Sequence, residues 1–237
     1  MSRARAFSCS TLARSLLFTV IAAACAEEPA SVGPKVEPLI RTPQFAVVPP
    51  PGASVTVQVS VPVSMRTSPF NVDRFLTIPP NFSISVFARR SGARFMAVAP
   101  NGDLLVSNPG AGAVYLIRPS TTGGDPTQFT WAAGLYKPHD IVFANIGGTM
   151  YVYVAEGDKI ARYTYNAAVT TGQARQVIIS GLPNASSPEL GGSYGHELKN
   201  IALDAAGKLY VSIASTCNVC LSDTQSSPVR AAVYVYN

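Results

Sequence analysis

The sequence predicts an all-β fold made of repeated units of short strands. The same order of strand, glycine-containing turn, strand, loop and strand recurs three times along the 237 residues. The composition agrees with this, because 47% of the residues are hydrophobic and can form a sizeable core, while 18 glycines and 19 prolines suit many tight turns. No stretch keeps a helical period, so long helices are not expected.

Each repeat has three strands at matching positions. They are expected over 95–99, 104–107 and 113–117 in the first repeat, over 141–144, 150–154 and 159–163 in the second, and over 201–204, 209–212 and 232–236 in the third. A fourth strand is expected ahead of each repeat, over 82–87, 128–132 and 176–180. Four strands per unit at intervals of about 45–60 residues predict the blades of a β-propeller. A β-sandwich is the alternative, although sandwich strands do not recur this regularly.

Residues 78–237 are expected to form a partial β-propeller domain. This segment has room for about three to four blades, whereas propellers typically close into a ring with about 4–8. A chain ending at Asn237 would leave long strand edges unpaired, which favours aggregation. We therefore expect a truncated propeller. Pairing with a second copy is the alternative, and nothing in the sequence favours it.

Residues 1–26 are expected to form an export signal. Three arginines accompany an apolar run, Leu16–Ala24, which is too short to span a membrane, and Ala24-Cys25-Ala26 fits an A-x-A cleavage site. The mature chain then starts near Glu27, or at Cys25 if this is a lipoprotein signal in which Cys25 is lipidated. Both readings predict an exported protein, periplasmic or secreted, whose only membrane contact would be that lipid.

Residues 27–77 are expected to be a Pro-rich lead-in. Proline-rich composition favours an extended tether. Within it, valines alternate strictly over 54–63, which predicts a half-buried strand with no obvious partner among the repeats. Removal of the signal would lower the formal net charge from +5 to about +2, and the remaining chain has no cluster of Lys or Arg. Nucleic acid is therefore not an expected partner.

Cys217 and Cys220 are the two cysteines that remain after the first 26 residues. A C-x-x-C pair in an oxidising compartment predicts a local disulfide. A haem would need His after the second cysteine, where Leu221 stands, and a structural zinc would need two further ligands nearby. A redox-active pair is the remaining alternative, although the flanking βαβ pattern of such proteins is absent.

The sequence has two histidines, His139 and His196, and each lies just before the first strand of a repeat. First strands line the central channel of a propeller, so residues that enter them converge on one face. Alignment of the repeats makes Arg94, His139 and Lys199 equivalent, and likewise Phe95, Asp140 and Asn200. Such a ring suits an anionic or polyhydroxylated ligand. The alternative is that these side chains only satisfy hydrogen bonds within loops.

Several motifs together resemble the glucose/sorbosone dehydrogenase superfamily, in particular its pyranose dehydrogenase type. They are Pro79–Ala88, Met96–Asp103, Pro138-His139, Gly195–Asn200, Leu209–Ser212, Cys217–Cys220 and Arg230–Ala232. The resemblance covers roughly residues 78–237, which would be the first half of a six-bladed domain. The sequence departs from the family pattern at Ala205-Ala206-Gly207, where Pro-Asp-Gly is usual, and at Ala214, where glycine is common.

The resemblance implies a dehydrogenase that oxidises an aldose or pyranose sugar at C1, with pyrroloquinoline quinone (PQQ) and calcium as cofactors. His196 matches the family's catalytic base, a role that suits imidazole. Arg94, His139, Lys199 and Asn200 are the expected cofactor-binding residues. The electron acceptor and the calcium ligands are not indicated. Because the family places further ligands in later blades, the chain alone is expected to be inactive.

Two other functions fit the same fold class. A propeller hydrolase of the lactonase kind would need carboxylate and amide metal ligands around the axis, for which Asp140 and Asn200 are the candidates. A non-catalytic exported propeller would bind a protein or a glycan through its loops.

Overall fold

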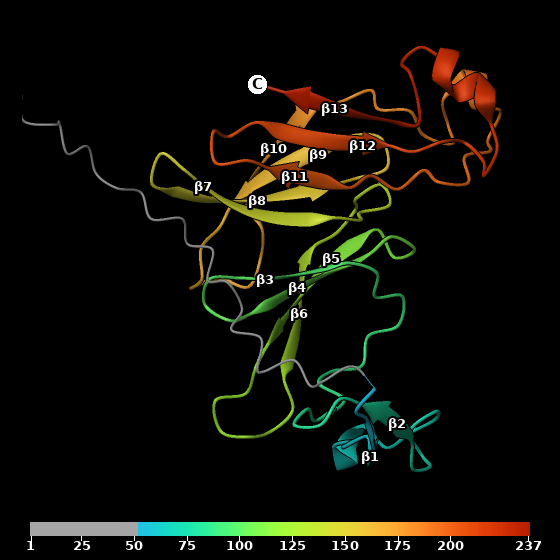
Figure 1. The fold of residues 1–237 in the computed structure, drawn as a ribbon. Helices are drawn as coiled ribbons and strands as arrows, with labels where there is room; N and C mark the ends of the chain where they lie inside the picture. Colours follow the sequence, from blue (N-terminus) through green and yellow to red (C-terminus); the bar gives the residue numbers. More distant parts are fainter. Residues whose placement is uncertain (1–51) are drawn as a thin grey trace, which may run out of the picture. The chain divides into compact units, whose positions relative to one another are not determined.

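The structure, a computed structural model, describes residues 52–237 (Figure 1). The predicted signal over 1–26, with Cys25 and Glu27, and the first part of the lead-in lie outside the described residues. The strands are β1 (Val55–Gln58), β2 (Phe75–Ile78), β3 (Met96–Val98), β4 (Leu104–Asn108), β5 (Ala113–Arg118), β6 (Thr127–Ala132), β7 (Ile141–Ile146), β8 (Thr149–Ala155), β9 (Ile160–Thr164), β10 (Gln173–Ile179), β11 (Ile201–Leu203), β12 (Leu209–Ile213) and β13 (Ala232–Tyr236).

The described residues are all-β, as predicted. Their helical segments are three short 3₁₀ turns, η1 (Val63–Met65), η2 (Pro188–Leu190) and η3 (Leu221–Gln225). No helix among residues 52–237 is long and apolar enough to cross a lipid bilayer.

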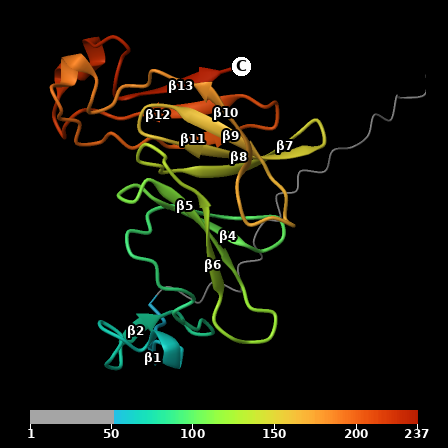
Figure 2. The same cartoon turned by 180° about the vertical axis from the view of Figure 1, so that it is seen from behind.

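Three sheets are built from strands that follow one another along the chain. Their orders are β3-β4-β5-β6, β7-β8-β9-β10 and β11-β12-β13, and every neighbouring pair is antiparallel (Figures 1 and 2). This is the arrangement of propeller blades. Residues 52–237 contain these three blade-like sheets and a separate pair, β1-β2, rather than a closed ring. We call the three sheets blades 1, 2 and 3.

The hairpin between β7 and β8 shows how the turn residues fix the pairing of strands. Ile146 pairs with Thr149, so the loop has two residues, Gly147 and Gly148, with φ of 58° and 83°. Two-residue hairpin loops of this type need positive φ at both positions, which glycine adopts without a steric penalty. The Gly-Gly pair therefore sets the register of blade 2.

Two predicted strands differ from the structure. Residues 82–87 form no strand, and only a parallel bridge between Ser60 and Ser85 touches them. The fourth strands of blades 1 and 2, β6 and β10, each follow the strand that they pair with. No described blade precedes residues 82–87, so these residues have no sheet edge to join. The alternating stretch 54–63 forms a strand only over β1, and it does have a partner, β2, which lies outside the repeats.

The hydrophobic core consists of two layers, one on each side of blade 2. Val152 and Val154 of β8 face blade 1, while Tyr153 and Ala155 face blade 3. All four side chains are buried, which explains why β8 is an almost continuous apolar run. Trp131 and Tyr163, with ring centroids 4.7 Å apart, join the first layer. Blade 2 therefore holds blades 1 and 3 through apolar contacts on both of its faces.

The predicted disulfide between Cys217 and Cys220 is confirmed. It lies in the loop between β12 and β13, directly before η3.

Candidate functional site

The backbone register supports the equivalence of the residues that enter the first strands. Ser107, Ala155 and Ser212 donate backbone N–H bonds of 2.8, 2.9 and 2.9 Å to the carbonyls of Phe95, Asp140 and Asn200, respectively. These three acceptors therefore occupy the same place in their blades. Arg94, His139 and Lys199 each lie one residue earlier.

His139 is buried where the three blades meet. Its ring packs against Phe95 of blade 1 with a centroid distance of 4.2 Å, and its Nδ1 lies 3.0 Å from the carbonyl oxygen of Lys199 in blade 3. Because a carbonyl only accepts, Nδ1 carries the proton in this contact. Nε2 is then left with a lone pair, and it has no hydrogen-bond partner among residues 52–237.

The surroundings of His139 favour the neutral imidazole. Burial lowers its pKa, and the positive charges of Arg94 and Lys199 act in the same direction. The bond to the Lys199 carbonyl and the charge of Asp140 oppose this without reversing it. His139 is therefore a neutral side chain held among the three blades.

Lys199 is completely buried. Its Nζ donates to the backbone carbonyl of Glu197 and lies 4.8 Å from the centre of the Tyr194 ring. Burial lowers the pKa of Lys199 to about 8, although Glu197 and Asp158 favour its charged form. The ammonium group lies inside the protein rather than at the surface.

Arg94 and Asn200 are the exposed members of the predicted set. The Arg94 side chain makes no hydrogen bond or ion pair within the described residues, so its five donors are available. The Asn200 amide lies 3.4 Å from Oδ2 of Asp140, the same oxygen that accepts the backbone N–H of Ile201 at 2.9 Å. Oδ1 of Asp140 accepts the N–H of Ile141 at 2.8 Å. Asp140 thus bonds the first strand of its own blade through Oδ1 and the first strand of blade 3 through Oδ2.

His196 is exposed, and its ring is held at one nitrogen. Nδ1 lies 2.9 Å from the carbonyl oxygen of Ser215, so Nδ1 again carries the proton. The Ser215 hydroxyl lies farther away, at 3.4 Å from Nδ1. Nε2 makes no hydrogen bond within residues 52–237. A neutral imidazole in this tautomer presents a lone pair on Nε2 and can accept a proton there.

A buried carboxylate next to His196 is the main feature that spacing did not reveal. Glu197 accepts the Tyr136 hydroxyl at 2.7 Å, the Lys137 ammonium and the backbone N–H of Ala185 at 2.9 Å. Burial raises the pKa of Glu197, but the bonds from Lys137, Ala185 and Tyr136 outweigh it and hold the pKa below its usual value. The cluster ties the loop before β7 to the loop before β11. The only hint of this cluster in the sequence is that charged residues, Lys137 and Glu197, lie close to the two histidines.

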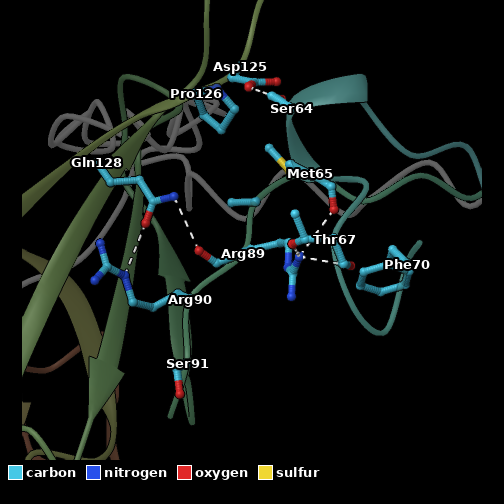
Figure 3. A pocket seen from close by; sticks show the side chains of 11 residues that line it. Ser64, Met65, Thr67, Phe70, Arg89, Arg90, Ser91, Asp125, Pro126 and Gln128 are labelled. Carbon is cyan, nitrogen blue, oxygen red and sulfur yellow. Dashed lines mark hydrogen bonds between the residues drawn. The ribbon is translucent and has the colours of Figure 1, made fainter.

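A cavity of about 810 Å³ lies elsewhere, between the lead-in and blade 1 (Figure 3). Arg89 dominates it, and its guanidinium donates to the carbonyls of Met65, Thr67 and Ser68 at 3.2, 3.1 and 2.6 Å. Gln128 accepts from Nε of Arg90 at 3.0 Å. Arg89 bonds the lead-in, and the adjacent Arg90 bonds β6 of blade 1. The cavity is therefore a structural junction between the lead-in and blade 1. None of the predicted site residues lines it.

No family model and no curated protein matches the sequence. Among solved structures, the holo form of the PQQ domain of pyranose dehydrogenase from Coprinopsis cinerea is similar over 67% of this chain, with a TM-score of 0.54 and 16% identity. An iodide structure of Carbohydrate-Active Enzymes family AA12 from Trichoderma reesei is similar over 78% of this chain, with a TM-score of 0.51 and 16% identity.

The chain spans 37% and 39% of the length of these two structures. At this level of identity the likeness shows the fold alone. Residues of this chain therefore share the fold of part of a pyranose dehydrogenase PQQ domain and of part of an AA12 protein, as three blade-like antiparallel sheets.

Proposed function

We propose that this chain is part of an exported quinone-dependent dehydrogenase that oxidises an aldose or pyranose sugar at C1. The observation that carries the proposal is His196, an exposed imidazole whose Nδ1 proton is held by the Ser215 carbonyl and whose Nε2 is open. The fold shared with the PQQ domain of a pyranose dehydrogenase supports the choice of cofactor. The Cys217–Cys220 disulfide supports export.

The exposed donors that precede the first strands fit an anionic quinone such as PQQ, which carries three carboxylates. Arg94 is an exposed cation without a partner in the described residues, and Asn200 offers an exposed amide. These two residues would contact the cofactor. His139 and Lys199 are buried, so they would not contact the cofactor directly. Lys199 would attract it through its positive charge, and His139 would support the site by joining the three blades.

Calcium fits residues 52–237 less well. No group of three or more His, Cys, Asp or Glu side chains in this part of the chain is arranged to hold a metal ion. Calcium would need backbone carbonyls or groups of the cofactor as ligands here.

When bound, the quinone supplies the two-electron acceptor for the sugar. The chain's own contribution is to accept the proton that the sugar loses. Nε2 of His196 accepts the proton of the C1 hydroxyl, and the positive charge that develops on the ring is stabilised at Nδ1 by the Ser215 carbonyl. The fixed Nδ1 bond also keeps the ring oriented, so that no reorientation is needed during the reaction.

The test uses a complete dehydrogenase that contains this chain, and it compares that enzyme with its His196→Ala variant, each supplied with PQQ and calcium. Loss of the base should lower sugar-dependent dye reduction about 10²–10⁴-fold, the usual worth of general base catalysis. Quinone binding, measured from the cofactor's absorbance, should change far less, because the base acts mainly in the transition state. Unchanged turnover in the variant would remove His196 from this role.

The same experiment separates the proposal from its alternatives. The 237-residue chain spans 37–39% of the matched structures, so we expect it to bind quinone weakly and to show no sugar oxidation by itself. Arg94→Ala should weaken that binding further. Lactone hydrolysis without quinone, or no quinone binding by any form of the protein, would contradict the dehydrogenase proposal.

A further inference from the structure

Two loop segments lie side by side at His196. One is 194–196, which leads into β11, and the other is 214–216, which follows β12. Their short hydrogen bonds run from the Tyr194 hydroxyl to the Ala214 carbonyl at 2.6 Å, from the Gly195 N–H to the Thr216 carbonyl at 2.9 Å, and from His196 Nδ1 to the Ser215 carbonyl at 2.9 Å. The position of the imidazole is therefore set by segment 214–216.

Asp223 of η3 fixes that segment from its other side. Its side chain is completely buried, and Oδ2 accepts the backbone N–H of Thr216 at 2.6 Å and the Thr216 hydroxyl at 2.8 Å. Oδ1 accepts Nε of Arg230 at 2.8 Å. Burial raises the pKa of Asp223, but the bonds from Arg230 and Thr216 outweigh it and keep the carboxylate ionised.

The Asp223 and His196 bonds meet on a single peptide group. The N–H of Thr216 and the C=O of Ser215 belong to the same planar unit, whose geometry is rigid. Asp223 accepts from one end of this unit while His196 donates to the other. A negative charge at the N–H end polarises the peptide and makes its oxygen a stronger acceptor, because hydrogen bonds in series strengthen one another.

We propose that Asp223 is a positioning residue for His196, acting through the Ser215–Thr216 peptide. In this arrangement a carboxylate, one peptide group and an imidazole form a relay that fixes the Nδ1–H tautomer, leaves Nε2 as the acceptor and stabilises the ring when it becomes charged. The role of this relay in catalysis rests on the proposed function of His196. The effect of Asp223 on the His196 tautomer does not depend on that function.

The space around Gly195 fits this interpretation. A Cβ at this position would lie 3.1 Å from the Thr216 carbonyl oxygen, tighter than an ordinary contact. Glycine therefore lets segments 194–196 and 214–216 approach closely enough for the His196 bond to form.

The first test is nitrogen NMR of the protein, which has two histidines and therefore two imidazole signal sets. In the neutral state both rings should have the proton on Nδ1. Asp223→Asn should lower the ratio of Nδ1–H to Nε2–H forms at His196 about 2–10-fold, the worth of one net hydrogen bond. His139, whose Nδ1 donates to Lys199 in the blade interior, should keep its tautomer and serves as the internal control. An unchanged His196 tautomer in a variant with a native His139 signal overturns the proposal.

A second measurement uses the unaltered protein and so does not depend on the folding of a variant. Because one peptide group connects both bonds, the Thr216 amide proton should shift as His196 is titrated. A Thr216 amide that does not respond to the protonation of His196 overturns the proposal even if Asp223→Asn fails to fold.

Turnover separates this inference from the proposed function. In the quinone-loaded dehydrogenase, Asp223→Asn should lower kcat with little effect on KM, and it should add nothing to the loss caused by His196→Ala, since the two residues act as a unit. Additive losses would overturn the relay. Absence of any dehydrogenase activity would contradict the function of His196 and leave the NMR result standing.

Discussion

At the scale of single residues, the structure divides the predicted cofactor set into exposed and buried members. Arg94 and Asn200 face solvent, while His139 and Lys199 are buried. Repeat spacing could predict that these residues enter equivalent strands, because the register of a blade is fixed by its hairpins. Spacing could not predict burial, which depends on how Tyr194 and Glu197 of the same loop, with Tyr136 from the loop before β7, surround Lys199.

The buried position of His139 predicts that the free energy of unfolding decreases in acid. Burial lowers its pKa below the ordinary 6.5, so the unfolded chain binds the proton more readily than the folded one. The stabilisation is fully present above about pH 6.5 and is lost progressively as the pH falls toward the folded-state pKa. Urea unfolding midpoints should therefore decrease between neutral pH and pH 5.

The variant for this prediction is His139→Gln. Replacement of the buried ring should flatten the decrease of the unfolding midpoint below pH 6.5. An unchanged pH dependence in this variant would show that the dependence arises elsewhere.

At the scale of elements, strands were predictable where the chain supplies its own partner. The three strands of each repeat follow one another as hairpins, so that local alternation and turn residues suffice to identify them. The segment 82–87 has the same alternating pattern, yet a strand exists only where a neighbouring edge accepts its hydrogen bonds. The sequence pattern of this segment does not tell whether a neighbouring strand is there to pair with it.

The disulfide loop predicts a small effect on global stability. Cys217 and Cys220 enclose a very short loop, so their bond removes little entropy from the unfolded chain. Replacement of both by serine should lower the free energy of unfolding by about 2 kcal/mol or less on the chain-entropy model. Chemical unfolding of the two proteins measures this.

Thiol titration provides the check on the bond itself. The unfolded but unreduced exported protein should show no free thiol from this pair. Two reactive thiols, or a loss well beyond about 2 kcal/mol in the serine variant, would mean that the bond is absent or that it does more than restrain one loop.

At the scale of the whole molecule, the faces of blades 1 and 3 that point away from blade 2 keep exposed apolar side chains. Met96 and Val98 are 66% and 70% exposed on β3, and Val233 and Val235 are 69% and 52% exposed on β13. In blade 3 these valines pair across the strands with Ser212 and Tyr210, on the face away from the second core layer. Strand β13 is also the edge of its sheet.

Such a surface predicts that the 237-residue chain self-associates as its concentration rises, because apolar faces and unpaired strand edges attract further copies. Val233→Thr with Val235→Thr keeps the β-branched shape and should shift association to higher concentration, as measured by sedimentation or light scattering. Val177→Thr on β10 is the matched control, since Val177 is 42% exposed but lies outside both open faces. A chain that stays monomeric at every concentration, or a control that reduces association equally, would show that these faces do not act as contact surfaces.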